Sequence, residues 1–167
     1  CSGEPVHPSL EPYLAAWDDS IDHPFESLTF AIRELTEEEA RRSLPGYESA
    51  DPIGDWPAGS IGWHLQQLID CWAFYRWQLE HYEQRSMPVP AAAPRSTSLS
   101  QARQLLREVG GQLRSTIATI DPVKLNEPGP QGNPLDEHLR MIVRHTSWHA
   151  GSIVVLRRLL RSTTPDQ

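Results

Sequence analysis

The sequence predicts an all-α protein folded as an antiparallel four-helix bundle, and three observations support this. Apolar residues recur at helical spacing in four separate segments. Helix-start signals open several of these segments, and clusters of proline and glycine separate them. No segment alternates apolar and polar residues between hairpin turns, so we expect no strands. Amphipathic helices joined by loops of varied length are typical of a bundle.

The chain is expected to hold one domain with short flanking segments, because its 167 residues match the usual size of a single domain. Residues 1–21 are expected to be partly irregular, with a short helix around Leu14–Trp17. Residues 22–161 are expected to form the bundle domain, and residues 162–167 a C-terminal tail.

Four main helices are expected, the first beginning at Asp22. A capping box of Thr36 and Glu39 opens a short additional helix that ends near Leu44. The second main helix begins after Ser60.

A stiff connector with three prolines follows this helix, and Ser98 or Ser100 caps the third. The fourth has Asn133 at its N-cap and Pro134 at its first position, and it runs to about Arg161. We expect the buried stripe to include Phe25, Leu28, Ile32, Leu65, Leu68, Trp72, Leu105, Leu113, Ile142, Ile153 and Leu156.

Composition narrows the range of partners. Fifteen lysines and arginines against 22 aspartates and glutamates give a net charge of -7. This argues against a nucleic-acid partner, because such proteins carry a clustered basic excess. No run approaches 18 consecutive apolar residues, so we expect no membrane partner, and without a signal-peptide pattern we expect a cytoplasmic protein.

The two cysteines, Cys1 and Cys71, are too few for a disulfide framework. We interpret Cys1 as a processing product or a sequence boundary, and the alternative is the acylated first residue of a bacterial lipoprotein. Cys71 lies among apolar residues, so we expect a buried small hydrophobe rather than a nucleophile.

The strongest chemical signal is a pair of histidines in the fourth helix. His145 and His149 are four residues apart, so they lie one turn apart on the same side of a helix. At about 100° per residue they share the buried stripe with Ile142 and Ile153. Two imidazoles at this spacing inside a bundle can chelate one divalent ion. The alternative is a pair of interior histidines satisfied by hydrogen bonds.

A third ligand is expected from the second helix. His64 lies at the edge of the buried face and Gln67 further out, and imidazole binds borderline metals better than an amide oxygen does. We therefore predict a site of His64, His145 and His149 for zinc or nickel. Asp70 could orient a ligand, but we interpret it as an exposed carboxylate.

Two motifs resemble the DinB/YfiT-like family: Ser60-Ile-Gly-Trp-His-Leu-Gln-Gln-Leu, and Arg144-His-x-x-x-His-x-Gly-x-Ile with a following Leu-Arg. The resemblance covers about residues 22–161 and implies a four-helix bundle with a three-histidine metal site. The histidine pair matches directly. The family's remaining histidine stands at the position of Gln67, so either His64 substitutes for it, Gln67 ligates through its oxygen, or the site is degenerate.

The resemblance also implies an activity. Several relatives transfer or isomerise low-molecular-weight thiols of the mycothiol or bacillithiol type, with a metal that lowers the thiol pKa. We therefore expect a thiol S-transferase or isomerase that takes a small-molecule thiol and an electrophilic substrate. The alternatives are a metal-dependent hydrolase and a non-catalytic, stress-associated bundle that binds a metal or a ligand.

Assembly is predicted from apolar residues that the bundle leaves outside. The second helix is rich in tryptophan, and the pair Val154-Val155 lies off the inward stripe. A second subunit could cover this surface, so we expect a homodimer.

Overall fold

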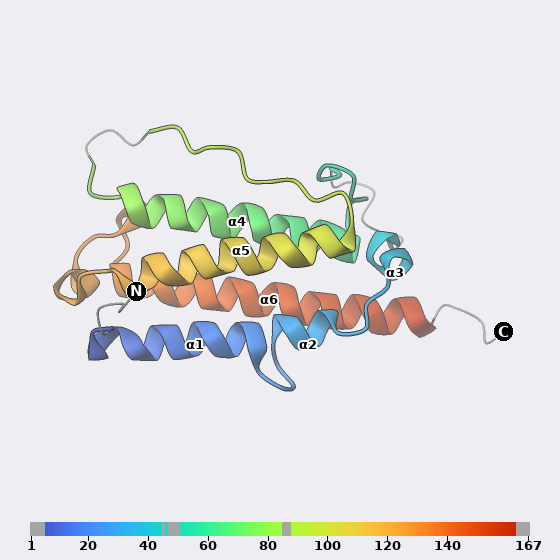
Figure 1. Cartoon of the computed structure of the whole chain (residues 1–167), viewed down its shortest axis with the longest axis horizontal. Coiled ribbons are helices and arrows are strands. Elements are labelled where there is room, and N and C mark those ends of the chain that lie inside the picture. The colour runs from blue at the N-terminus through green and yellow to red at the C-terminus, as the bar shows by residue number, and fades with distance from the viewer. Residues whose placement is uncertain (1–5, 45, 47–50, 85–87, 163–167) are drawn as a thin grey trace.

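The structure, a computed structural model, describes residues 6–44, 46, 51–84 and 88–162. Four long helices dominate it (Figure 1): α1 (Glu11–Asp22), α4 (Ile61–His81), α5 (Leu99–Ala118) and α6 (Leu135–Ser162). The described residues contain two isolated β-bridges and no strand. The predicted all-α class is therefore confirmed.

Short helices complete the fold. They are the 3-10 helices η1 (Pro8–Leu10), η2 (Pro122–Asn126) and η3 (Pro130–Gly132) and the α-helices α2 (Leu28–Ile32) and α3 (Glu37–Arg41). Helix α2 packs against the second half of α6 (Figure 1).

The first long helix lies earlier in the sequence than predicted. The short helix expected at Leu14–Trp17 is part of α1, which packs into the core, and the helix expected from Asp22 onward is wrong. His23 is extended at ψ 141° because it precedes Pro24, a position that disfavours helical backbone. The chain resumes helical structure at α2, whose N-cap is Ser27.

Most predicted caps are confirmed. Thr36 and Glu39 form a reciprocal capping box, and the hydroxyls of Ser60 and Ser98 cap α4 and α5. The start of α6 differs by one residue: the helix begins after Pro134, whose carbonyl accepts the first helical hydrogen bond from the backbone N–H of His138.

The long helices do not simply alternate in direction. Trp72 and Glu80 of α4 contact Gly110 and Thr116 of α5 in the same order, so these helices run parallel. Helix α6 runs antiparallel to α4 (Figure 1). Two consecutive helices that run parallel need a connection that returns along the whole length of the first helix. A 21-residue helix spans about 30 Å, and the proline-rich segment before α5, at about 3 Å per residue, returns over that length.

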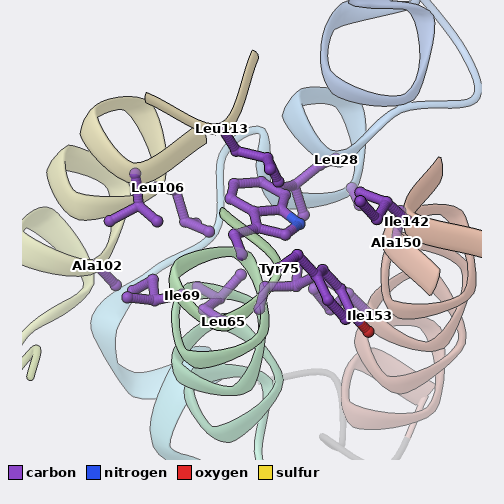
Figure 2. Packing of buried hydrophobic residues seen from close by; sticks show 14 of the residues in the cluster. Leu28, Leu65, Ile69, Tyr75, Ala102, Leu106, Leu113, Ile142, Ala150 and Ile153 are labelled. Atoms are coloured by element: carbon purple, nitrogen blue, oxygen red, sulfur yellow. The ribbon is translucent and has the colours of Figure 1, made fainter. Parts of the chain in front are cut away.

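One apolar core joins the helices. Figure 2 shows Leu65, Ile69, Leu106 and Ile153 among the side chains from α4, α5 and α6 that point toward a common interior. Eight of the eleven residues predicted for the buried stripe are buried, and two others, Ile32 and Leu105, are partly buried against the core. The prediction is wrong for Phe25, which is 74% exposed because it lies in the loop between α1 and α2.

In the part of the chain that the structure describes, no helix is long and apolar enough to cross a membrane. Cys1 lies outside the described residues.

Candidate metal centre

Two helices bring the three predicted histidines together. His64 lies in the first turn of α4, which the Ser60 cap fixes, and its backbone N–H donates to the Ser60 carbonyl. His145 and His149 lie one turn apart on α6. Because α6 runs antiparallel to α4, the start of α4 meets the middle of α6, and the three histidine side chains lie in contact with one another.

The histidines form a linear chain of contacts. His64 Nδ1 lies 3.0 Å from His149 Nδ1, and His149 Nε2 lies 3.1 Å from His145 Nε2. The chain ends at Tyr75 of α4, whose hydroxyl lies 2.6 Å from His145 Nδ1. His149 therefore stands in the middle and uses both of its ring nitrogens.

This geometry bears on metal binding. The Nε2 atoms of His145 and His149 converge and fit two ligands of one ion, whereas His64 approaches His149 from the opposite ring nitrogen. Among the residues that the structure describes, no three histidine, cysteine, aspartate or glutamate side chains are arranged to hold a metal ion. The arrangement thus fits a two-histidine half-site, because His64 contacts the His149 nitrogen on the opposite side of the ring from His145.

Burial keeps the imidazoles neutral. It lowers the pKa of His64 to about 4, and it lowers that of His149 to about 3 with a smaller contribution from the charges that His64 and His145 would carry. Burial also lowers the pKa of His145, which is half-buried. Neutral imidazole is the form that ligates a metal, so these groups are available as ligands at neutral pH.

Two buried polar atoms beside the cluster lack a hydrogen-bond partner: His64 Nε2 and the side-chain oxygen of Gln67. Gln67 follows His64 by one turn and precedes Tyr75 by two turns, so at about 100° per residue all three lie within about 80° of one another around α4. An unpaired buried acceptor costs free energy unless a donor or a cation satisfies it. The side-chain oxygen of Gln67 is therefore available as a ligand from α4.

Tryptophans surround the cluster. The Trp148 ring lies 4.7 Å from that of His149 and is stacked at 6.2 Å on that of His145, and Trp63 packs edge-on against His64 at 5.1 Å. Trp148 is itself 59% exposed, so it stands between the imidazoles and solvent.

The other sequence candidates have structural roles. Asp70 accepts a hydrogen bond from Gln66 and forms an ion pair with Arg95. Within the described residues it makes no contact with a histidine. Cys71 is half-buried and burial raises its pKa to about 11, so its thiol is protonated at neutral pH, in keeping with a small hydrophobe.

Sequence reasoning missed Tyr75 and His138. Tyr75 was detectable, because it lies three turns after His64 on the same side of the helix. His138 is 3% exposed on α6, its ring packs edge-on against that of Tyr75, and its Nε2 has no hydrogen-bond partner. It lies two turns before His145 and reaches the chain of histidines only through the Tyr75 ring.

Comparison with protein families gives one match. A family model described as the DinB superfamily matches residues 14–153, which is most of the chain. Comparisons with curated proteins and with solved structures gave no significant match.

Proposed function

We propose that this chain, which belongs to the DinB superfamily, binds one divalent metal ion at its histidine cluster and acts as a metal-dependent thiol S-transferase or isomerase. The observation that carries the proposal is the convergence of His145 Nε2 and His149 Nε2 at 3.1 Å on one turn of α6. His64 is the third ligand that we propose, because it is buried and neutral and already contacts His149.

The donor set favours zinc or nickel, because imidazole nitrogens suit both and the residues that the structure describes place no oxygen-rich cage around them. When bound, such an ion would stabilise the thiolate of a mycothiol- or bacillithiol-type thiol at neutral pH for attack on an electrophilic substrate.

The surrounding side chains prepare the histidines for this role. The Tyr75 hydroxyl oxygen can accept from His145 Nδ1–H, and this tautomer fixes the orientation of the ring and leaves the lone pair of Nε2 for a ligand. Trp63 and Trp148 pack against the rings, and burial lowers the pKa of all three imidazoles, which are therefore neutral at neutral pH. Because His64 contacts the other ring nitrogen of His149, binding of all three histidines to one ion would require the rings to reorient.

A second candidate function is a non-catalytic bundle that binds a ligand. The observation that favours it is that the histidines already contact one another through both nitrogens of His149. The family's usual histidine is also replaced by Gln67. A metal-dependent hydrolase would share the metal site and differ in the substrate that it activates.

Metal content tests the proposal directly. Protein purified, stripped with chelator and titrated with zinc or nickel should bind one ion per chain by calorimetry. His145→Ala and His149→Ala should lose this binding, whereas the control variant His81→Ala, which removes a histidine at the far end of α4, should keep it. Unchanged stoichiometry in His149→Ala contradicts the site.

The ligand from α4 is identified by a second pair of variants. His64→Ala should weaken binding more than Gln67→Ala does, and the reverse order assigns the third position to Gln67. Thiol transfer by fully metal-free protein contradicts the mechanism, and the non-catalytic function predicts metal or ligand binding without turnover.

Assembly and location remain predictions. Of the surface expected to meet a second subunit, Val155 is 56% exposed on α6, whereas Val154 is partly buried and the α4 tryptophans Trp63, Trp72 and Trp77 are buried or half-buried. Sedimentation at micromolar concentration should show a dimer, and a single species of monomer mass would contradict the predicted homodimer. The cytoplasmic location is a prediction from the sequence.

A further inference from the structure

An arginine-lined pocket lies near the C-terminal end of α6, on a different side of the helix from the histidine cluster. It has a volume of about 250 Å³ and is formed where α2 and the turn after it pack against the last third of α6 (Figure 1). Its lining includes Arg33 from the turn and Arg157, Arg158 and Arg161 from α6. At about 100° per residue, the α6 arginines lie about 80–180° around the helix from His149, so this pocket is separate from the candidate metal centre.

Most of these guanidinium groups keep free donors. Arg158 makes no ion pair or hydrogen bond within the described part of the chain, and Arg33 lies over the Phe30 ring at 5.7 Å without an ion pair there. Arg157 donates to the Ala31 carbonyl, but its Nε is buried and has no partner. Arg161 pairs with Glu39 at 2.7 Å. The pocket thus presents several N–H groups that lack an acceptor.

Charge in the pocket is unbalanced. Four guanidinium groups face two carboxylates, Glu34 in the lining and Glu39 beside it, although the whole chain carries a net charge of -7. The pKa of Arg157 is lowered by burial first and then by the charge of Arg161. Placing these cations together is therefore unfavourable without an anion between them, and a bound anion would relieve the repulsion.

The wall of the pocket is held in place from a third helix. Arg103 of α5 donates through Nη2 to the carbonyls of Ile32 and Leu35, on both sides of the turn that carries Arg33. Within this turn Glu34 adopts the left-handed conformation, φ 58°, which is uncommon for a residue other than glycine. The backbone that carries Arg33 is thus fixed before any ligand arrives, which reduces the entropy lost on binding.

We propose that this pocket binds the phosphate or carboxylate group of a small anionic molecule. Guanidinium groups bind both oxyanions through paired N–H donors, which a lysine cannot reproduce. Phe30 and Val154 form an apolar side of the same pocket and suit a short carbon skeleton attached to the anionic group. The volume of about 250 Å³ restricts the ligand to a small molecule.

Calorimetry at constant ionic strength tests the proposal with three probes: inorganic phosphate, glycerol phosphate and succinate. Arg158→Gln is the informative variant because it removes a charge that supports no other contact. It should weaken binding of the best probe about tenfold, as expected for loss of one charge-assisted hydrogen bond. Arg144→Gln removes an exposed arginine elsewhere on α6 and should leave the affinity unchanged. The ranking of the probes distinguishes phosphate from carboxylate as the preferred group.

The same titration in His149→Ala separates this pocket from the histidine cluster. Binding that persists in His149→Ala and weakens in Arg158→Gln supports the pocket. Three results would overturn it: no saturable binding of any probe at millimolar concentration, equal affinities in Arg158→Gln and Arg144→Gln, or loss of binding in His149→Ala. None of these outcomes depends on whether the histidine cluster binds a metal.

Discussion

His64 and His149 meet through their Nδ1 atoms at 3.0 Å, although 85 residues separate them in the chain. The contact joins the first turn of α4 to the middle of α6 in a buried environment. In this pair one nitrogen must donate its N–H and the other must accept with its lone pair, and a protonated imidazole has no nitrogen that can accept. This pairing therefore requires at least one neutral ring, and acid should weaken it.

Stability should fall as the pH drops below about 6.5. Burial lowers the pKa of His138 to about 4, so the unfolded chain binds more protons than the native state between these values. The free energy of unfolding is then highest above pH 6.5, the pKa of histidine in the unfolded chain. It decreases as the pH falls toward about 4, the pKa of His138 in the folded protein. His138 alone should account for a loss of about 2 kcal/mol between pH 7 and pH 5.

Urea unfolding of wild type and His138→Gln in chelator at both pH values measures this contribution. The variant should lose less stability than wild type between pH 7 and pH 5, by about 2 kcal/mol. Parallel losses in the two proteins would show that His138 is not buried as a neutral group.

Tyr75→Phe should weaken metal binding about tenfold without removing a proposed ligand, because the hydroxyl orients the His145 ring from 2.6 Å. Far-ultraviolet circular dichroism should be unchanged. Tyr13→Phe is the matched control, since its hydroxyl bonds Asp136 at a distance from the cluster. Equal zinc affinities in Tyr75→Phe and Tyr13→Phe would remove Tyr75 from the site.

Gln66→Ala should detach the connector from α4. The side-chain oxygen of this fully buried residue accepts from the backbone N–H and the hydroxyl of Ser96, both at 2.8 Å, and its nitrogen donates to the Pro94 carbonyl. Leaving these buried groups unpaired should cost about 2–3 kcal/mol. Hydrogen exchange of the Ser96 amide should accelerate as well.

Gln101→Ala is the control for Gln66→Ala. Its side chain makes the same two bonds, to the backbone N–H and hydroxyl of Thr97, but on the surface. Water can replace them, so the expected loss is below about 1 kcal/mol. Similar losses in the two variants would show that burial does not set the cost.

Local signals predicted much of this fold. The caps at Thr36, Ser60 and Ser98 were predictable because each depends on residues within one turn. The parallel arrangement of α4 and α5 was not, because it depends on contacts such as that between Trp72 and Gly110, which no periodicity reveals.

Helical periodicity also predicted which histidines would meet. It could not predict how their rings are turned, because ring orientation depends on side-chain packing and on partners such as Tyr75. The linear order of His64, His149 and His145 is therefore a finding that spacing alone could not provide. The arginine pocket likewise combines Arg33 with residues more than 100 positions later.

Gly62→Ala should destabilise the protein by about 3 kcal/mol, whereas Gly111→Ala should stabilise it by about 1 kcal/mol. Both glycines lie within helices, where alanine is intrinsically favoured. A Cβ at Gly62, however, would overlap the ring of Trp56, which is fully buried and bonded through Nε1 to Ser96 Oγ. A Cβ at Gly111 meets nothing within 4 Å. Urea unfolding of the two variants should give shifts of opposite sign, and destabilisation by both would mean that the ring of Trp56 does not lie against α4.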